Sequence, residues 1–277
     1  MGAPPWVDTH VHLLPVRLNG AIRAFFADHG VAPGTFAYPV EPAVVCEQLA
    51  AEGVTMAWTL PYVRRPGAAD ALNAAIAGIV DAQRSGPLPL VAGATVHPAD
   101  HDPVGVVRRA VEDLGARVLK LHCSVGDHRP DDRRLDAVWD YASEIALPVV
   151  VHAGHAASGH TEADELAPIG VVGRRHPEAR VIIAHCGHRA VSAALDLLDA
   201  HPALHADLTP VVRDPVTLPA ARARELADRL LFGSDAPNTA VTARAGRAAV
   251  EELGLPAPLT AQVLGGNAAR LLDEVRV

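Results

Sequence analysis

The sequence predicts an α/β fold, a (β/α)8 TIM barrel, from its length, its apolar content and its alternation of strand-like and helix-like segments. The chain has 277 residues, and about 250 residues is usual for such a barrel. Apolar residues make up 49% of the chain and aromatic residues only 4%, so a large core of aliphatic side chains can be buried. We expect residues 1–277 to form a single domain, because we find no linker, repeat or low-complexity tract.

Eight short apolar runs are expected to form the strands. Each is almost continuously apolar, which is typical of strands buried on both faces of a parallel sheet. In chain order the runs span residues 6–13, 55–60, 90–96, 117–123, 148–152, 181–185, 204–208 and 230–233. Eight such runs with helices between them fit a closed barrel better than an open, doubly wound sheet.

Segments with helical spacing of apolar residues lie between these runs. They span residues 42–52, 68–83, 104–114, 132–145, 162–175, 190–200 and 219–229, and residues 240–253 and 260–274 are expected to close the ring. Residues 15–39, which contain several aromatic side chains, are long for a first loop. Two readings of this segment remain open, a lid over the barrel mouth and a surface helix packed through its aromatic residues.

Charge and cysteine content narrow the expected partners and compartment. The net charge is −8 and no dense stripe of Lys and Arg is present, which speaks against a nucleic-acid partner. The three cysteines are widely spaced without a Cys-x-x-Cys motif, which favours a reduced, cytoplasmic protein. We see no signal peptide and no apolar run of about 18 residues that would span a membrane. A small-molecule substrate is the expected partner, and a homo-oligomer is left open.

Polar residues stand at the ends of several predicted strands, where barrel enzymes carry their chemistry. His10 and His12 end the first run, and their spacing places both imidazoles on one face of the strand. The others are Lys120 and His122 in the fourth run, His152 in the fifth, His185 in the sixth and Asp235 after the eighth. A single buried histidine is usually a hydrogen-bonded core residue, but core histidines have no reason to converge on one rim. Because imidazole and carboxylate suit zinc and similar divalent ions, the sequence predicts a metal site.

Lys120 is the only lysine among the 24 Lys and Arg residues. The arginine excess has an ordinary explanation in a GC-rich genome. Even so, a lysine amine can lose its proton or react with carbon dioxide to form a carbamate, whereas a guanidinium in practice does neither. Lys120 is therefore a candidate for a role that arginine cannot fill.

Taken together, these segments resemble the amidohydrolase superfamily over nearly the whole chain, and most closely its amidohydrolase-2 branch. The matching pieces are Asp8-Thr9-His10-Val11-His12, Lys120-Leu121-His122, His152-Ala153-Gly154, His185-Cys186-Gly187, Gly233-Ser234-Asp235 and the segment from Gly266-Asn267 to Leu272. The branch contains hydrolases, lactonases and non-oxidative decarboxylases of aromatic or related acids. Their order and placement on the predicted strands make the resemblance specific.

The resemblance implies a divalent metal cofactor, with zinc expected and one or two ions open. His10, His12 and Asp235 would bind the first ion, and Asp235 would also take a proton from its water. His152 would complete a one-metal site or belong to a second. His185 would be a second-metal ligand or, in a one-metal site, an acid or base. In two-metal members a carboxylated lysine on the fourth strand bridges the ions; Lys120 lies there, and a bare amine paired with a substrate carboxylate is the alternative.

The expected function is that of a hydrolase in which a metal-activated water attacks a small amide, lactone or ester, with Asp235 and His185 as catalytic residues. The alternative is metal-dependent, non-oxidative decarboxylation of a small aromatic or related carboxylic acid. A catalytically silent barrel is a third reading, and the intact ligand set argues against it.

Several loop residues are candidates for substrate binding. Arg64 and Arg65 follow the second predicted strand and could hold a carboxylate bidentately, although a solvated loop charge is the more usual reading of such residues. His97 follows the third strand and is a further candidate. Three loop histidines after the fifth and sixth strands, His155, His160 and His188, would shape the pocket or be incidental.

Overall fold

Eight parallel strands form one sheet in which each strand pairs with the next along the chain. The computed structural model describes residues 5–154 and 161–277. The strands are β1 (Val7–Val11), β2 (Met56–Thr59), β3 (Leu90–Thr95), β4 (Val118–Leu121), β5 (Val149–Val151), β6 (Val181–Ile183), β7 (His205–Asp207) and β8 (Leu230–Leu231). The β8 segment returns to β1, because the Thr9 N–H donates to the Phe232 carbonyl at 3.0 Å and the Asp235 N–H to the His10 carbonyl at 2.9 Å. The predicted (β/α)8 TIM barrel is therefore confirmed.

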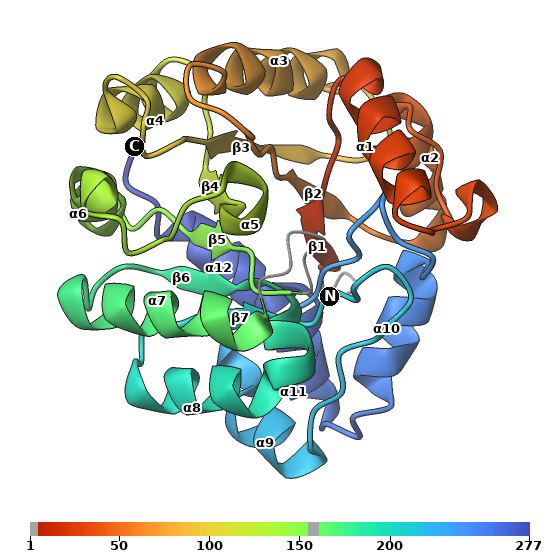
Figure 1. The fold of residues 1–277 in the computed structure, drawn as a ribbon. Coiled ribbons are helices and arrows are strands. Elements are labelled where there is room, and N and C mark those ends of the chain that lie inside the picture. Colours follow the sequence, from red (N-terminus) through yellow and green to blue (C-terminus); the bar gives the residue numbers. More distant parts are fainter. Residues whose placement is uncertain (1–4, 155–160) are drawn as a thin grey trace.

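Helices surround the strands on all sides (Figure 1). They are α1 (Val16–Asp28), α2 (Pro42–Glu52), α3 (Ala69–Ala82), α4 (Pro103–Glu112), α5 (Cys123–Gly126), α6 (Asp136–Glu144), α7 (Glu162–Arg175), α8 (Val191–Ala200), α9 (Ala220–Glu225), α10 (Ala243–Glu251), α11 (Ala257–Ala261) and α12 (Asn267–Asp273). Short turns are η1 (Pro33–Thr35), η2 (Arg133–Leu135), η3 (Ala184–Ala190), η4 (Ala227–Arg229) and the π turn η5 (Gln262–Gly266). No helix within the described ranges is both long enough and apolar enough to cross a membrane.

The predicted element bounds differ from the observed ones in two ways. The long helical segments at 132–145, 219–229 and 260–274 are each divided by a 3-10 or π turn. Several strands are also shorter than predicted, and the sixth ends at Ile183 rather than residue 185. Beyond Ile183 the chain turns over the barrel rim in left-handed conformation, which apolar patterning does not reveal.

The long segment after β1 contains a helix packed through aromatic residues. The rings of Phe26 and Phe36 are tilted by 58° to each other with centroids 5.5 Å apart, and the Arg23 guanidinium stacks over Phe36 at 3.7 Å. Arg23 also donates hydrogen bonds to the carbonyls of Tyr38 and Pro237. The segment is thus fastened to the loop after β8, beside the barrel mouth.

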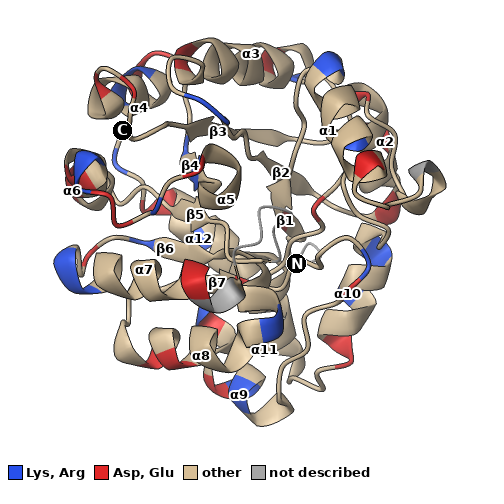
Figure 2. Ribbon diagram, in the orientation of Figure 1, with Lys and Arg blue, Asp and Glu red and all other residues tan. Residues whose placement is uncertain are grey.

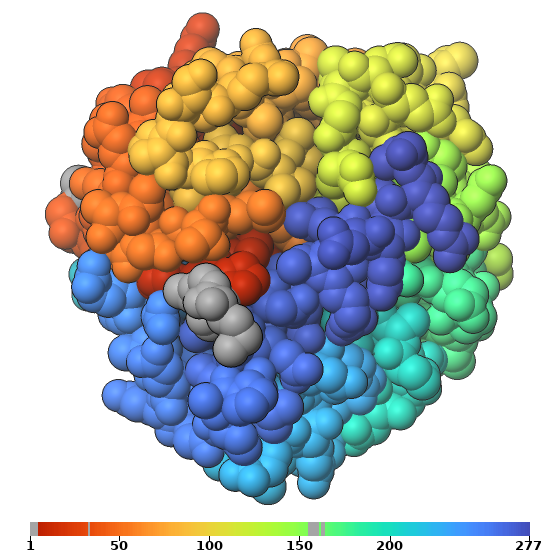
Figure 3. Space-filling model, turned by 180° about the vertical axis from the view of Figure 1, so that it is seen from behind, coloured from red at the N-terminus to blue at the C-terminus, as the bar shows by residue number. Residues whose placement is uncertain are grey.

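The barrel interior is filled by side chains that point inward from the strands. They form one buried cluster of Val7, Trp58, Leu60, Val118, Val150, Ile182, Ala184 and Leu231, and Ala268 and Leu271 of α12 join it. Figure 3 shows the molecule from behind. The C-terminal segment, in dark blue, lies near the middle of this back face, beside a red segment from the N-terminal part of the chain. The end of the barrel opposite the strands' carboxyl ends is therefore covered by the C-terminal helix α12.

The packing of the C-terminal segment on this end of the barrel requires η5 to approach the start of β1 closely. A Cβ atom added at Gly265 would lie 2.2 Å from the carbonyl oxygen of Pro5, whereas one added at Gly266 would meet nothing nearer than 3.5 Å. We expect Gly265→Ala to destabilise the protein by about 3 kcal/mol, because backbone must shift to relieve the overlap. Gly266→Ala is the matched control and should be neutral or stabilise by up to about 1 kcal/mol, since its backbone is helical. Urea unfolding of both metal-free variants checks this, and equal midpoints would contradict it.

Candidate metal centre

Six aromatic side chains form a closed cycle at the carboxyl ends of the strands. Each ring contacts the next, with centroids 3.8 to 5.2 Å apart. In order around the cycle they are His10, His12, Tyr62, His122, His152 and His185. The predicted strand-end histidines therefore do converge on one rim.

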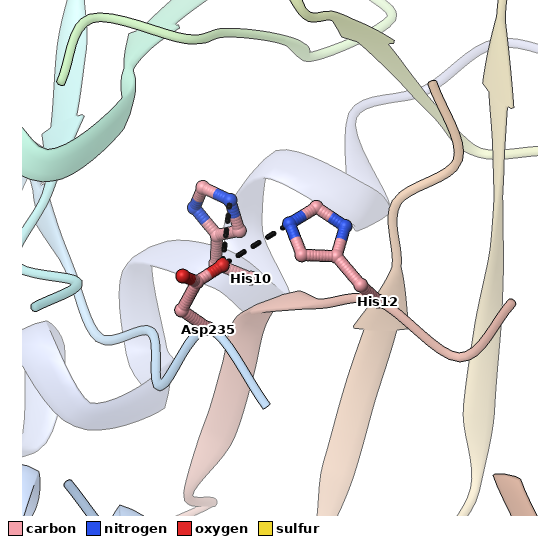
Figure 4. A group of neighbouring side chains, drawn as sticks. All are labelled: His10, His12 and Asp235. Carbon is pink, nitrogen blue, oxygen red and sulfur yellow. Dashed lines mark ion pairs between the residues drawn. The ribbon is translucent and has the colours of Figure 1, made fainter. Parts of the chain in front are cut away.

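His10, His12 and Asp235 present one ligand atom each toward a common point (Figure 4). These three atoms all lie within 4.8 Å of one another. Nε2 of His12 is 3.1 Å from Oδ1 of Asp235, and Nε2 of His10 is 3.8 Å from the same oxygen. The outer nitrogen of His12 is held by the Leu60 carbonyl at 2.7 Å. Two imidazole nitrogens and a carboxylate oxygen are a donor set that suits zinc and similar ions.

The carboxylate of this group is ionised near neutral pH. Burial by itself would raise the pKa of Asp235, but the hydrogen bond and charge of His12 and the charge of His10 outweigh it, so the pKa is lowered. The backbone of Asp235 is left-handed, with a φ of 66°. Such a conformation is costly for a residue other than glycine and is found most often at functional sites.

The imidazoles of His10, His152 and His185 are neutral and available as ligands. Burial, followed by the charge of Lys120, lowers the pKa of His10 to about 3. Burial also lowers the pKa of His152 and of His185. Nδ1 of His185 is bonded to the Thr209 carbonyl at 3.2 Å. Among the described residues, Nε2 of His152 and Nε2 of His185 have no hydrogen-bond partner. Buried polar atoms without partners are uncommon in proteins, so these two fit a site for a metal ion.

Lys120 lies inside the barrel next to this group. Its side chain is fully buried, and Nζ is 3.1 Å from Nε2 of His10. Burial lowers the pKa of Lys120 to about 8, against the opposing charges of Asp207 and Asp235. The lone lysine thus reaches the predicted metal ligands from the fourth strand.

Sequence reasoning missed Asp207, the last residue of β7. It is fully buried, and Oδ2 accepts a hydrogen bond from Nδ1 of His10 at 2.9 Å. The signal was present in the sequence, because Asp207 is the only acidic residue within the seventh apolar run.

Tyr62 and His122 are two further members of the cycle to which the sequence assigned no function. The Tyr62 ring stands perpendicular to His12, at 88° and 5.2 Å, and also contacts His122. His122 is stacked on His152, with centroids 3.8 Å apart and planes 16° apart. For His122, the spacing of two residues from Lys120 was the available signal, whereas Tyr62 lies in a loop where only tertiary structure brings it to the site.

The candidate substrate-binding residues lie in different surroundings. Arg64 and Arg65 are exposed. His97 is buried, and its Nδ1 accepts from the Ala99 N–H at 3.1 Å while its Nε2 donates to the Gly126 carbonyl at 2.9 Å. Both ring nitrogens of His97 are therefore engaged with backbone. Of the loop histidines, His188 is buried, and His155 and His160 lie outside the described residues.

Charged side chains elsewhere are distributed over the outer helices. Acidic and basic positions are interspersed along these helices (Figure 2). The charged groups that the barrel buries are instead concentrated around the cycle of rings and include Asp8, Lys120 and Asp207. Burial raises the pKa of Asp8 to about 7, although it accepts from the N–H groups of His10 and Ser234.

Comparison with known proteins gives one family match and many similar folds. A family model described as amidohydrolase matches residues 7–273. A search of curated proteins finds no match. The similar structures include an uncharacterised TIM-barrel protein from Bordetella bronchiseptica, with a TM-score of 0.74, 20% identity and coverage of 98% of this chain and 99% of that one.

Two further similar structures have named activities. A 5-carboxyvanillate decarboxylase from Novosphingobium aromaticivorans, solved with bound manganese and a nitrobenzoic acid, has a TM-score of 0.67 and 13% identity, and covers 98% of this chain and 97% of its own. A dihydroorotase from Saccharomyces cerevisiae, solved with 5-fluoroorotic acid, has a TM-score of 0.66 and 12% identity, and covers 99% of this chain and 85% of its own. At these identities the likeness shows a shared fold and says nothing of a shared activity.

Proposed function

The chain belongs to the amidohydrolase family, and from that premise we propose that it is a metal-dependent hydrolase of a small amide, lactone or ester. The position of Lys120 carries the proposal. Its amine is buried in the barrel, 3.1 Å from Nε2 of His10 and beside the other metal donors. A lysine in this place supports a site with two metal ions, in which a water is activated for attack on a carbonyl.

Two sets of side chains would hold the ions. His10, His12 and Asp235 would hold the first, and zinc suits their nitrogen and oxygen donors. His152 and His185, whose Nε2 atoms lack partners among the described residues, would hold the second. Bound divalent ions would supply Lewis acidity and lower the pKa of a water toward about 7.

Lys120 would join the two sets as a carbamate. The neutral amine adds to the carbon of dissolved carbon dioxide, an N–C bond forms, and one proton leaves to solvent. The product is a carboxylate with two oxygen donors. Nζ of Lys120 lies 3.1 Å from Nε2 of His10, and the His10 ring contacts the His185 ring with centroids 4.9 Å apart, so oxygen donors at the end of the Lys120 side chain would lie close to both sets.

Asp235 would move the proton. It is the only carboxylate of the three-donor group, and Oδ1 lies 3.1 Å from Nε2 of His12 in a partly buried position. A carboxylate there can accept a proton from the attacking water and return it to the leaving nitrogen or oxygen. As the water oxygen bonds to the carbonyl carbon, the C–N or C–O bond of the substrate breaks.

The hydrolase proposal is tested by zinc content, carbamate formation and activity in one series. Protein is loaded with Zn²⁺ in ¹³C-bicarbonate buffer, and metal content, the ¹³C carbamate signal and activity on a panel of amides, lactones and esters are measured. Since the chain has no second lysine, a side-chain carbamate signal must come from Lys120. We expect two ions per chain, and Lys120→Met should lose the signal, one ion and at least about 10²-fold in activity. One ion without a carbamate, together with release of carbon dioxide from an aromatic acid, would contradict a hydrolase.

That contrary result would support the second candidate, a metal-dependent decarboxylase. The observation that favours it is Tyr62, an aromatic ring within the site that stands against His12 and contacts His122. Such a ring can stack on an aromatic acid. The fold likeness to a manganese-bound decarboxylase points the same way. Asp235 or His185 would then protonate the ring carbon as the carboxyl group leaves as carbon dioxide.

A further inference from the structure

Asp207 lies behind the metal donors and contacts two of the histidines at once. It ends β7, its side chain is fully buried, and it is separated in sequence from His10 by 197 residues. An ionised carboxylate is costly to bury unless hydrogen bonds replace its hydration. Oδ2 accepts from Nδ1 of His10, and Oδ1 accepts from the backbone N–H groups of His185 and Thr209. Its two oxygens therefore have different partners.

The bond to His10 determines which ring nitrogen carries the proton. A carboxylate accepts hydrogen bonds and does not donate them. With Oδ2 of Asp207 only 2.9 Å away, Nδ1 of His10 must be the protonated nitrogen. The lone pair is then left on Nε2, which faces Asp235 and Lys120. A metal ligand needs this tautomer, and a partner behind the ring is the usual means of selecting it.

The other carboxylate oxygen of Asp207, Oδ1, binds a segment whose backbone has an uncommon conformation. His185, Cys186, Gly187 and His188 have consecutive φ values of 56°, 44°, 69° and 47°. For residues other than glycine, left-handed backbone costs about 1–2 kcal/mol per residue. Oδ1 of Asp207 accepts from the His185 N–H at 2.8 Å and from the Thr209 N–H at 3.1 Å. The Thr209 carbonyl in turn binds Nδ1 of His185 at 3.2 Å. The bond from Asp207 to the Thr209 N–H therefore also helps to orient the His185 ring.

From this geometry we infer that Asp207 is a positioning residue that couples the two halves of the metal centre. One carboxylate selects the His10 tautomer and holds the His185 backbone, so that Nε2 of both rings is presented to the site. The inference rests on the proposed metal centre and does not depend on the reaction. A substitution at Asp207 should therefore change both the tautomer of His10 and the position of the His185 ring.

The test is Asp207→Asn, which keeps the shape of the side chain and removes its charge. The carboxamide oxygen can still accept from the His185 and Thr209 N–H groups, which leaves its NH₂ group facing Nδ1 of His10. Nδ1 must then accept, and the proton moves to Nε2. In metal-free protein with ¹⁵N-labelled histidine, we expect NMR to show the Nδ1–H tautomer of His10 in the wild type and the Nε2–H tautomer in the variant. Zn²⁺ affinity should fall by about 10–100-fold.

His205→Asn is the matched control. His205 lies two residues earlier on the same strand, is buried, and its Nδ1 is bonded to the Ala203 carbonyl, a bond that an asparagine side chain can still donate. It should leave the His10 tautomer and Zn²⁺ affinity as in the wild type. An unchanged His10 tautomer in Asp207→Asn, or an Nε2–H tautomer in the wild type, would overturn the inference. Failure of wild-type protein to bind Zn²⁺ would sink the proposed metal centre, whereas the tautomer spectra test Asp207 without metal.

Discussion

The His10→Asn protein should fold but bind Zn²⁺ at least about 10³-fold more weakly than the wild type, a larger loss than the 10–100-fold that removal of an outer partner costs. The substitution deletes Nε2, one of only three ligand atoms that gather within 4.8 Å in the described part of the chain. An asparagine amide can take the place of Nδ1 and still donate to Asp207, which avoids leaving that buried carboxylate without a partner.

The measurement is competition for Zn²⁺ against a chelating dye, with thermal unfolding of the metal-free proteins alongside. His205→Asn serves again as the control, because it makes the same substitution at a buried histidine of a neighbouring part of the barrel that does not belong to the cycle of rings. It should bind Zn²⁺ as the wild type does. If His10→Asn also retained wild-type affinity, the three-donor group would not be the metal site.

Asp235→Asn should lower turnover by about 10³-fold while much of the bound metal is retained. The amide oxygen can still act as a ligand, but an amide cannot take up the proton that a general base removes, and such proton transfers contribute about 10²–10⁴-fold to rate. The environment lowers the pKa of Asp235, so in the wild type this group is a carboxylate over the whole neutral range. The loss should therefore appear in kcat and persist at every pH from 6 to 9, about the range over which a carboxylate stays ionised.

The control for Asp235→Asn is Asp214→Asn, which removes a carboxylate from the loop after β7. Asp214 is largely exposed and lies 3.4 Å from the Arg189 guanidinium. Its loss should leave kcat within about twofold, as expected for a surface ion pair. Metal content is measured in the same samples. If turnover by Asp235→Asn matched that of the wild type, proton transfer would have to be assigned to another group, with His185 the next candidate.

Much of the fold and of the metal group could be predicted from the sequence, because both follow from short-range regularities. Apolar runs of strand length alternating with helical spacing describe a βα repeat, and the observed bounds of α2 and α7 agree with the prediction at both ends. In a parallel barrel all strands end at one face. Polar residues at those ends, such as His10, His12 and Asp235, must then approach one another whatever the loops do.

The contribution of loop residues to the site could not be predicted from strand ends alone. Substrate binding by Arg64, Arg65 and His97 stays a prediction: the arginines are exposed, and both ring nitrogens of His97 are bonded to backbone. Tyr62 comes from an irregular loop and reaches the cycle of rings through contacts with His12 and His122. Loop conformation depends on contacts across the molecule, so no local pattern predicts it.

The sequence by itself predicted eight strands, five of which carry imidazoles, a lysine or a carboxylate at or just after their ends, because strand and helix periods are properties of neighbouring residues. Tertiary structure alone decided how those groups are held. The Asp207 bond to His10 spans 197 residues of sequence, and the left-handed turn at His185 is held by the same carboxylate. Such bonds form only when the barrel closes, since closure brings the first strand next to the β8 segment and so within reach of the seventh strand.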